Sequence, residues 1–499
     1  MDAGTKIIYE SSAEKATAEI LQAEVKARNG WKWKVLHTGK HIAGAVVIKS
    51  AKNNKSDAED YSLTVCSTQL VLQATSDAGL FYAVQSLLQM ADARGISAGR
   101  PVTLPAIHIT DAPHFAWRGL LLDESDHFYG KQTVEELLDA MAYLKLNRLH
   151  WHLTDDAGWR IEIKRYPKLA QIGGKGNWSD PQAPAAYYTQ ADIREIVAYA
   201  QQRRIIIIPE VDMPGHATAA TRAYPEISGG GTGEWADFTF NPARSETYVF
   251  LRNVLQELDA LFPGPYLHLG GDEVSFGNQP WSTDPKILNF SRNHGLTNAV
   301  ELEKYFVRRM AAVNHDLGKT TMGWDEITRA GVPPATAAIM WWRHDQTNVL
   351  KQALDHGYPV VLCPRLPCYF DYDQAAAHQY GRRFKRQFNR LEDVYDSPGT
   401  NITEIINANP RAKIMGLEAC LWTEWMPDRT RLDYMTFPRL AAFAEAAWTP
   451  PTAKNKANFM ARTKWYLHEL DRRKIPYYNP FNPASTPEPF GPKNHQTRP

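Results

Sequence analysis

Short apolar runs alternate with amphipathic stretches along the chain from about residue 115 onward. Eight of these runs are short and rich in aliphatic side chains, a pattern typical of buried strands. Their sequences are RGLLLDE, NRLHWHL, RIIIIPEVD, YLHLGGDE, KTTMGWDE, AAIMWW, PVVLCP and KIMGLEACLW. The stretches between them repeat apolar residues at helical spacing, as Val134, Leu137, Leu138 and Met141 do. Alternating strands and helices form parallel sheets, and eight repeats favour an α/β fold closed into a (β/α)8 TIM barrel.

The residues before the barrel show a different pattern. Residues 34–50 and 60–75 contain runs of β-branched side chains, and residues 80–88 carry a helical apolar stripe. We therefore expect a small α+β N-terminal domain over residues 1–112, the barrel over 113–478 and a Pro-rich C-terminal tail over 479–499. Because the predicted barrel is longer than the roughly 250 residues that are usual, long loops should follow some strands.

Charge and hydropathy exclude several classes of partner. The 499 residues carry 56 basic and 55 acidic side chains, so the balance gives no electrostatic reason to expect nucleic acid or an anionic membrane as partner. No apolar run approaches the roughly 20 residues that span a bilayer. The first 15 residues lack the basic and apolar regions of a signal peptide. Localisation stays open, with a secreted or periplasmic site expected if a leader has been removed.

Cysteine and aromatic content add two expectations. Four cysteines are too few for a disulfide framework, and Cys363 and Cys368 are expected to be buried free thiols. The chain also has 15 Trp and 22 Tyr, whose aromatic faces stack on the apolar faces of sugars as well as filling cores.

Polar and aromatic side chains gather where the predicted strands end, which is the face that carries the chemistry of a TIM barrel. Carboxylates and histidines follow the second, third and fourth strands, and tryptophans with further acids follow the later ones. The residues are His150, His152, Asp155, Asp156, Glu210, Asp212, His216, Asp272, Glu273, Trp324, Asp325, Glu326, Trp341, Trp342, Tyr369, Asp371, Trp422 and Glu424.

Several of these residues also have a purely structural interpretation. An isolated His-Trp-His is more often packing than a metal site, Asp212 and His216 could cap a helix, and Trp341 is expected in the core. Their joint placement favours chemistry, and carboxylates with aromatic walls suit glycoside hydrolysis. A metal hydrolase that uses the His and Asp residues as ligands is the rival hypothesis, but the chain has no H-E-x-x-H motif.

The motifs FAWRG, HWHLTDDAGWR, PEVDMPGH, HLGGDEV and ACLWTE, which follow one another in this order along the predicted barrel, resemble the family 20 glycoside hydrolases, the β-N-acetylhexosaminidases. The resemblance covers the whole barrel, and the preceding α+β region is similar to that family's usual N-terminal domain. It implies exo-acting hydrolysis of a terminal β-linked N-acetylhexosamine from a glycan, without a metal or cofactor.

The resemblance also implies a division of work between two adjacent acids. The substrate's own 2-acetamido oxygen attacks the anomeric carbon and forms an oxazolinium ion, so no enzyme nucleophile is needed. Glu273 would be the general acid and then the general base, and Asp272 would accept the acetamido N–H. Neighbours on a strand point to opposite faces, so we expect the strand to bend or end at Gly270 and Gly271.

The other implied roles follow by position in the motifs. Tyr369 would donate to the acetamido oxygen, and His216 with Asp155 would support the general acid, with Asp156 as the alternative partner. The residues expected to bind the terminal sugar are Arg118, Trp324, Trp342, Asp371, Trp422 and Glu424. Arg118 falls early in its predicted strand, although a residue that faces the sugar should lie near the end of a strand. The sequence therefore does not determine where that strand begins.

The chain departs from the family pattern at four positions. Asp126 stands where the family commonly has Arg in D-x-x-R-x-F, and Glu418 stands where Gln is usual before ACLW. His114 and Ala157 are the other two departures. They put supporting hydrogen bonds and loop order in question rather than the proposed chemistry.

Two further functions stay open at this stage. A disaccharide-releasing enzyme of the lacto-N-biosidase type would need a wider pocket, and Asp371 with Glu424 argues for a closed site that holds one sugar. A catalytically inactive sugar-binding protein is the hypothesis from another class, and the presence of Asp272, Glu273 and Tyr369 argues against it. The choice between GlcNAc and GalNAc and the oligomeric state are not determined by the sequence.

Overall fold

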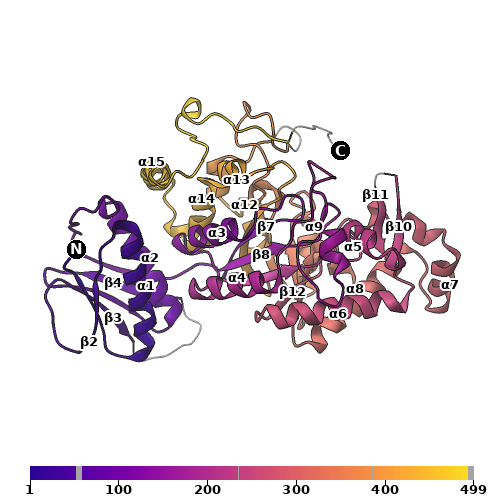
Figure 1. Cartoon of the computed structure of the whole chain (residues 1–499), viewed down its shortest axis with the longest axis horizontal. Helices are drawn as coiled ribbons and strands as arrows, with labels where there is room; N and C mark the ends of the chain where they lie inside the picture. Colours follow the sequence, from indigo (N-terminus) through magenta and orange to yellow (C-terminus); the bar gives the residue numbers. More distant parts are fainter. Residues whose placement is uncertain (52–58, 234, 384–386, 493–499) are drawn as a thin grey trace. The chain divides into compact units, whose positions relative to one another are not determined.

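The computed structural model describes residues 1–51, 59–233, 235–383 and 387–492 (Figure 1). The chain forms two compact units. One comprises Met1–His114, Asp139–Leu146 and Trp448–Arg472, and the other comprises Phe115–Leu138, Asn147–Ala447 and Arg473–Pro499. Residues 479–492 of the predicted tail contain only the short turn Pro483–Ser485, and residues 493–499 lie outside the described residues. In the described residues no helix is both long and apolar enough to cross a membrane.

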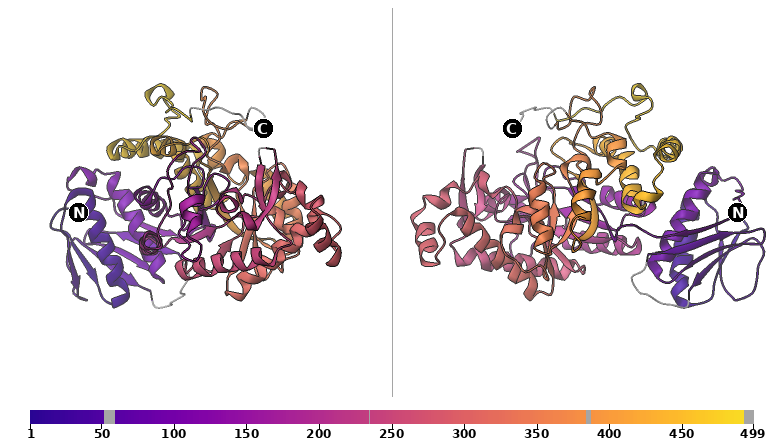
Figure 2. Two further views of the ribbon diagram at one scale, coloured as in Figure 1. Left: turned by 45° about the vertical axis from the view of Figure 1, so that its right-hand side comes forward. Right: turned by 180° about the vertical axis from the view of Figure 1, so that it is seen from behind.

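The first unit is built on a six-stranded mixed sheet. In spatial order its strands are β2 (Lys34–His37), β1 (Lys6–Tyr9), β3 (Ala45–Ser50), β5 (Gln69–Ala74), β4 (Tyr61–Val65) and β6 (Ile107–Asp111). β4 runs in the opposite direction to the other five strands of this sheet. Helices α1 (Ser12–Asn29) and α2 (Asp77–Asp92) pack against this sheet and beside each other (Figure 2). The apolar stripe predicted over residues 80–88 is the buried face of α2. The prediction of a small α+β domain before the barrel is therefore confirmed.

The second unit contains a closed barrel of eight parallel strands. All eight predicted runs form strands of this barrel, because each carries aliphatic residues on both faces and is covered on both sides. In order around the barrel the strands are β12 (Tyr266–His268), β13 (Thr320–Trp324), β14 (Ala337–Trp341), β15 (Pro359–Leu362), β16 (Lys413–Leu421), β7 (Trp117–Asp123), β8 (Arg148–His152) and β9 (Ile206–Glu210). The pairing of His268 in β12 with Glu210 in β9 closes the ring. The predicted TIM barrel is confirmed.

Helices follow the strands and cover the outside of the barrel. α4 (Gln190–Gln202) packs on β9, α8 (Ala299–Asp316) packs on β13, and α9 (Thr347–Asp355) packs on β14 and β15. Local sequence marks their ends: Thr189 and Asp192 form a reciprocal capping box at the start of α4. The other α-helices of the described residues are α3 (Lys131–Tyr143), α5 (Thr218–Ala223), α6 (Ser245–Leu261), α7 (Pro285–Asn293), α10 (Arg365–Cys368), α11 (Leu391–Tyr395), α12 (Thr400–Asn407), α13 (Arg429–Thr436), α14 (Arg439–Trp448) and α15 (Lys456–Arg473). Of these, α15 belongs to the first unit through Arg472.

The loops at the carboxyl ends of the strands include secondary structure of their own. The hairpin β10 (Ser228–Thr232) and β11 (Trp235–Phe240) follows β9, and a long loop with little regular structure follows β15. Cys363 and Cys368, near the start of that loop, are buried free thiols, as predicted.

A group of buried ionisable side chains lies inside the barrel. His150 Nε2 is 3.0 Å from Glu210 Oε2, and His150 Nδ1 is 2.8 Å from Glu418 Oε1. Glu418 also accepts a hydrogen bond from the indole N–H of Trp117, and Glu210 from that of Trp324. Burial lowers the pKa of His150, but Glu418 and Glu210 outweigh it and raise that pKa to about 9. The barrel interior therefore holds an imidazolium between two carboxylates, and Glu418 supplies one of them.

This arrangement predicts a loss of stability at alkaline pH. The pKa of a histidine is near 6.5 in an unfolded chain, so a folded value of about 9 gives His150 a stabilising contribution that is complete below pH 6.5. The contribution is lost as pH rises through 9 and amounts to about 3.5 kcal/mol at most, at about 1.4 kcal/mol per pKa unit. Glu418→Gln removes one carboxylate at nearly constant volume, so its urea midpoint should fall less than the wild-type midpoint between pH 6.5 and 9. Parallel pH profiles of the two proteins would contradict this assignment.

Candidate active site

The two adjacent acids lie in a loop that follows β12, not on the strand itself. β12 ends at His268, and Gly270, Gly271 and Glu273 all have positive φ angles, of 64°, 95° and 51°. Glycine is needed at position 270 because a Cβ atom there would lie 1.7 Å from Asp212 Oδ1. The turn brings both carboxylates toward one side chain: His216 Nε2 is 3.8 Å from Asp272 Oδ2 and 3.6 Å from Glu273 Oε2. The expectation that the strand ends near the glycines agrees with this geometry.

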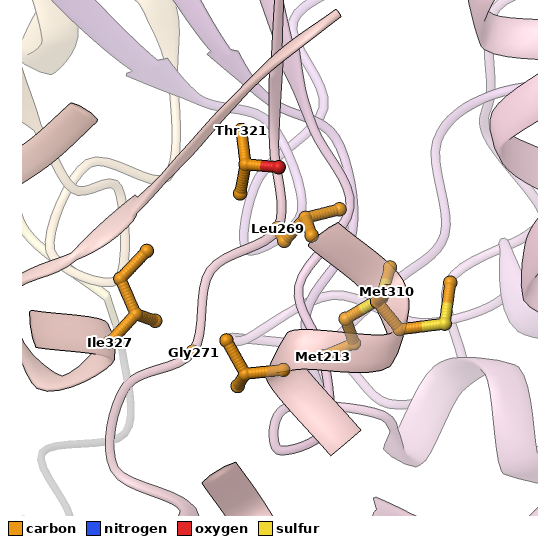
Figure 3. A pocket seen from close by; sticks show the side chains of 7 residues that line it. Met213, Leu269, Gly271, Met310, Thr321 and Ile327 are labelled. Carbon is orange, nitrogen blue, oxygen red and sulfur yellow. The ribbon is translucent and has the colours of Figure 1, made fainter. Parts of the chain in front are cut away.

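An apolar pocket lies behind this loop and supports it (Figure 3). A Cβ atom at Gly271 would lie 2.4 Å from Ile327 Cγ2, so the close approach of the loop to this wall requires glycine. The pocket has no charged side chain in its lining and therefore offers packing rather than chemistry. Its lining residues are Met213, Leu269, Gly271, Val307, Met310, Thr321 and Ile327.

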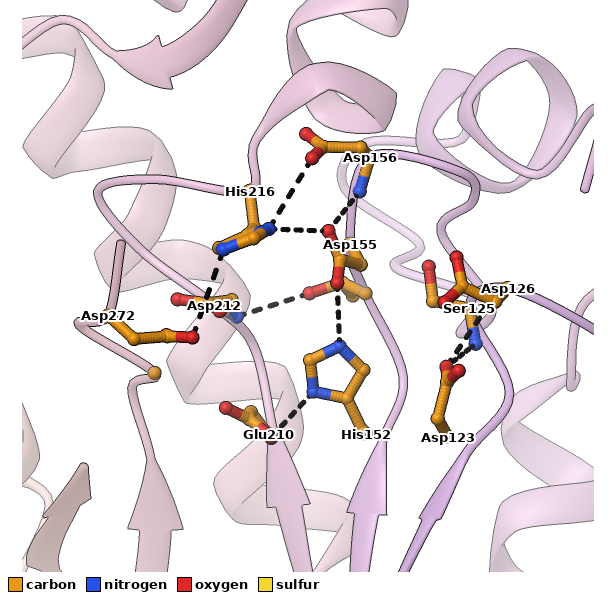
Figure 4. A network of polar contacts seen from close by, with 12 residues as sticks. Asp123, Ser125, Asp126, His152, Asp155, Asp156, Glu210, Asp212, His216 and Asp272 are labelled. Carbon is orange, nitrogen blue, oxygen red and sulfur yellow. Dashed lines mark hydrogen bonds and ion pairs between the residues drawn. The ribbon is translucent and has the colours of Figure 1, made fainter. Parts of the chain in front are cut away.

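His216 connects the two acids to a second pair of carboxylates from the loop after β8 (Figure 4). Its Nδ1 is 2.8 Å from Asp155 Oδ1 and 3.4 Å from Asp156 Oδ2. Asp156 instead accepts a hydrogen bond from the hydroxyl of Thr218 at 2.5 Å. The shorter distance favours Asp155 as the partner of the imidazole, and Asp155 also lies 3.3 Å from His152 Nε2.

The chain of contacts continues from Asp155 into the barrel interior. His152 Nδ1 is 2.6 Å from Glu210 Oε2, and Glu210 in turn contacts His150 and His268. Burial lowers the pKa of His216, but Asp155 and the other acids outweigh it and hold that pKa well above its ordinary value. Burial alone would raise the pKa of Asp155, yet His216 and His152 lower it. The pair is therefore an imidazolium and a carboxylate, and it is fixed from behind by the barrel.

Asp272 and Asp212 share a buried, acidic environment. Burial raises the pKa of Asp272 to about 7, with His216 opposing and Glu273 reinforcing the rise. Burial and the charge of Asp272 raise the pKa of Asp212 well above its usual value, so Asp212 holds the proton of the pair. Asp272 Oδ1 is buried and accepts no hydrogen bond within the described part of the chain. This oxygen is an acceptor aimed at whatever occupies the site.

Four aromatic rings, one from the end of each of β13, β14, β15 and β16, form one wall of the site. Trp342 stacks parallel to Tyr369 with ring centroids 6.4 Å apart, and Trp422 lies 6.0 Å from Tyr369. Trp324 is 5.8 Å from Trp422 and is fully buried behind it. All four residues were predicted for the site, and the structure brings them together.

A group of polar residues lies at the carboxyl ends of β15 and β16. Asp371 is buried, and neither of its carboxylate oxygens accepts a hydrogen bond from the described residues. Glu424 Oε1 accepts a hydrogen bond of 2.6 Å from Arg382 Nη2, and its Oε2 is buried without such a donor in the described residues. Arg382 Nε also lies 3.3 Å from Asp371 Oδ2. The two acids were predicted from the sequence, and the arginine between them was not.

Comparison with known families covers both units of the chain. The family model "Glycosyl hydrolase family 20, catalytic domain" matches residues 115–451, and the model "Glycosyl hydrolase family 20, domain 2" matches residues 1–112. The chain belongs to glycosyl hydrolase family 20. The family that the motifs predicted is therefore confirmed.

Similar family 20 proteins come from several bacteria. A β-hexosaminidase of Porphyromonas gingivalis is 34% identical over 81% of this chain and 52% of its own length, so this chain spans about half of that relative. A β-N-acetylhexosaminidase of Cellulomonas fimi is 31% identical over 95% of this chain and 91% of its own length. Among solved structures, the family 20 exo β-N-acetylglucosaminidase of Vibrio harveyi in complex with N-acetylglucosamine matches with a TM-score of 0.85 at 30% identity. That match covers 96% of this chain and 76% of the Vibrio chain.

Arg118 lies away from the group of predicted site residues. It is the second residue of β7, its side chain is buried, and its Nη1 donates a hydrogen bond of 2.9 Å to the carbonyl oxygen of Phe115. Asp123 ends the same strand near the site, and five residues of strand separate the two by roughly 16 Å. The prediction that Arg118 binds hydroxyls of the sugar is therefore wrong, because the residue lies at the opposite end of the barrel.

Several groups of side chains have the composition of a metal site. In the groups around Glu210 and around His216 with Asp155, the imidazoles and carboxylates form ion pairs with one another. An ion is therefore not needed to account for the arrangement of these two groups. Within the described residues the groups are His150–Glu210–His268, Asp155–Asp156–His216, Asp212–His216–Asp272, Asp373–His378–Glu488 and Asp123–Asp126–Glu424.

Two residues of the site escaped assignment from the sequence. Asp212 was expected at a strand end, and the only specific role considered for it was to cap a helix. The structure buries it beside Asp272, which favours its protonated form. Arg382 is one of two adjacent arginines in the long loop after β15. Nothing in the sequence distinguishes the one that faces the site from its neighbour Arg383, which pairs with Asp373.

Proposed function

We propose that this protein is an exo-acting, retaining β-N-acetylhexosaminidase that removes terminal GlcNAc or GalNAc by substrate-assisted catalysis. The observation that carries the proposal is the contrast between its two adjacent acids. The side chain of Asp272 is 15% exposed and has a buried oxygen that accepts no hydrogen bond from the described residues, whereas the side chain of Glu273 is 32% exposed. Both approach His216. The buried acceptor suits an acetamido N–H, and the more exposed acid suits a glycosidic oxygen.

In the first step the acetamido carbonyl oxygen bonds to the anomeric carbon as the bond from that carbon to the leaving oxygen breaks. Glu273 donates its proton to the leaving oxygen, and the sugar becomes an oxazolinium ion. Asp272 accepts a hydrogen bond from the acetamido N–H and stabilises the positive charge that develops on the nitrogen. The internal nucleophile reacts quickly because its attack does not require a second molecule to be brought into place.

In the second step Glu273 takes a proton from water as the water oxygen bonds to the anomeric carbon. The bond to the acetamido oxygen breaks, and the acetamide is restored with retained configuration. His216, which Asp155 holds in place, lies within 4 Å of both acids and can position their carboxyl groups toward the sugar. The aromatic wall and the Asp371–Glu424 pair would hold the terminal ring, which is why single residues are the proposed product.

The assay for this function compares chromogenic β-glycosides that differ only in the sugar. We expect hydrolysis of the β-GlcNAc and β-GalNAc substrates and little or no hydrolysis of the β-glucoside, which has no 2-acetamido group. A thiazoline analogue of the oxazolinium ion should inhibit competitively. Hydrolysis of the glucoside at a similar rate, or activity insensitive to the thiazoline, would overturn the proposal. Activity that disappears with a chelator would favour the metal hydrolase instead.

A further inference from the structure

Arg382 is a charged side chain that stays accessible while its partners are buried. The side chain of Arg382 is 39% exposed, whereas those of Asp371 and Glu424 are 0% and 13% exposed. If Arg382 served only to neutralise the two acids, we would expect its guanidinium to pack against both carboxylates and be buried with them. Arg382 instead meets each acid through one nitrogen, Nε for Asp371 and Nη2 for Glu424.

Backbone hydrogen bonds hold Arg382 on both sides and so set the direction of its Cα–Cβ bond. The N–H of Arg382 donates to the carbonyl oxygen of Asp371 at 2.9 Å, and the N–H of Asp373 donates to the carbonyl oxygen of Arg382 at 3.1 Å. These two bonds form a short parallel bridge between Arg382 and Tyr372. The loop is thereby tied to the chain segment that carries Asp371.

Donors and acceptors converge on one small region beside the aromatic wall. A guanidinium has five N–H donors. The contacts of Arg382 with Asp371 and Glu424 use Nε and Nη2, which leaves further N–H groups on this partly exposed side chain. Asp371 and the Oε2 atom of Glu424 present buried acceptors without a hydrogen bond from the described residues. A sugar hydroxyl both donates and accepts, so neighbouring hydroxyls of a pyranose ring match this combination.

The electrostatics place Arg382 within the same site as the general acid. Burial lowers the pKa of Arg382, but Glu424, Asp371, Tyr372 and Glu273 outweigh it and raise that pKa. On the other side of Glu424, burial together with Asp123, Glu424 and Asp155 raises the pKa of Asp126 well above its usual value, which favours its neutral form. An aspartate carries no positive charge in either protonation state, so the cation beside Glu424 comes from Arg382.

We propose that Arg382 is a substrate-binding residue that donates hydrogen bonds to the hydroxyls at C4 and C6 of the terminal sugar. It would act together with Asp371 and Glu424, which accept from the same hydroxyls. This inference rests on the proposed function and deepens it. It places the substrate-binding arginine on a loop after β15, whereas the motif resemblance implied Arg118, with contacts to the hydroxyls at C3 and C4.

The test replaces Arg382 by Ala and by Lys, with Arg383→Ala as the matched control. Arg383 is the adjacent residue, its side chain is 42% exposed, and it pairs with Asp373. Loss of charge-assisted hydrogen bonds should lower kcat/KM of Arg382→Ala for the aryl β-GlcNAc substrate by roughly 10- to 100-fold. Arg382→Lys should recover part of the loss, and Arg383→Ala should stay near wild type.

Substrate analogues distinguish contact with the sugar from simple neutralisation of the two acids. With 4-deoxy and 6-deoxy β-GlcNAc substrates, the ratio of wild-type to Arg382→Ala kcat/KM should shrink for the analogue that lacks the contacted hydroxyl. An unchanged ratio for both analogues would overturn the proposal. The proposal would also be overturned if the double variant Arg382→Ala/Glu424→Gln had the same kcat/KM as Glu424→Gln alone. Arg382 would then serve only to balance the charge of Glu424.

Failure of the proposed function would be visible separately. If the wild type hydrolyses none of the substrates, titration calorimetry with GlcNAc on the wild type and Arg382→Ala still tests the contact. Weaker binding by the variant, with the difference reduced for 4-deoxy or 6-deoxy GlcNAc, would support the assignment. Equal binding by the two proteins, or no binding by either, would reject it.

Discussion

Replacement of Glu273 by Gln should slow the hydrolysis of a GlcNAc disaccharide by roughly 10²- to 10⁴-fold, the usual contribution of a positioned general acid. The leaving oxygen of a sugar is a poor leaving group and needs the proton that Glu273 donates. An aryl glycoside whose phenol leaves easily needs no proton in the first step, so its first-step rate should fall far less. The amide is similar in size to the carboxyl group, and the loop geometry with φ of 51° at position 273 should persist.

The measurement is kcat/KM for a series of aryl β-GlcNAc substrates with phenols of increasing acidity. The dependence on the leaving group should be steep for Glu273→Gln and shallow for the wild type. Thermal unfolding of both proteins controls for damage to the fold. Equal losses across the whole series would show that Glu273 does not protonate the leaving group.

Replacement of Asp272 by Asn should reduce kcat/KM by roughly 10²- to 10³-fold for poor and good leaving groups alike, as expected for loss of one preorganised electrostatic contact. The asparagine keeps the size of the side chain but removes the negative charge that stabilises the developing oxazolinium. Its NH2 group can also face the acetamido N–H, where a donor is unfavourable. Asp272 stabilises the developing oxazolinium ion whatever the leaving group is. A better leaving group should therefore not rescue the variant.

The pH profile provides an independent check on Asp272. Burial raises its pKa to about 7, with His216 opposing and Glu273 reinforcing the rise. A carboxyl group is neutral below its pKa, so wild-type kcat/KM, which reports on the free enzyme, should fall as pH drops below about 7. That acidic limb should be absent in Asp272→Asn. A variant that keeps the same limb would show that another group is responsible for it.

The barrel was predictable because its sequence pattern is strong and local. Each strand is short, apolar on both faces and followed by a helix with one apolar stripe, and the pairing of β9 with β12 follows once eight such units close. The turn at Gly270 and Gly271 was also predictable, since glycines beside two acids indicate a backbone that leaves the strand.

The arginine of the site could not be predicted in the same way. The sequence pattern predicts that Arg118 lies on a strand, but it does not determine where that strand begins. The position of the strand start decides at which end of the barrel Arg118 lies. Arg382 and Arg383 are adjacent in an irregular loop, where no periodicity determines which one faces the site. Only the three-dimensional contacts of Arg382 with Asp371 and Glu424 separate them.

The protonation states of the site also depend on the fold rather than on the motif. Asp212, Asp272 and Glu210 come from two loops and a strand, and burial near one another raises the pKa of the first two. His150 is charged because Glu418 comes from the far end of the sequence to meet it. Such pairings follow from closure of the barrel and leave no local pattern in the chain.

The most direct test of substrate assistance varies the nucleophile within the substrate. Aryl β-GlcNAc analogues whose acetamido methyl carries one, two or three fluorines have a progressively less nucleophilic carbonyl oxygen and almost unchanged shape. If that oxygen attacks the anomeric carbon in the site of Asp272 and Glu273, wild-type kcat/KM should fall steeply with each fluorine. Values of kcat/KM that do not depend on fluorination would contradict the account, because the nucleophile would then belong to the enzyme or to water.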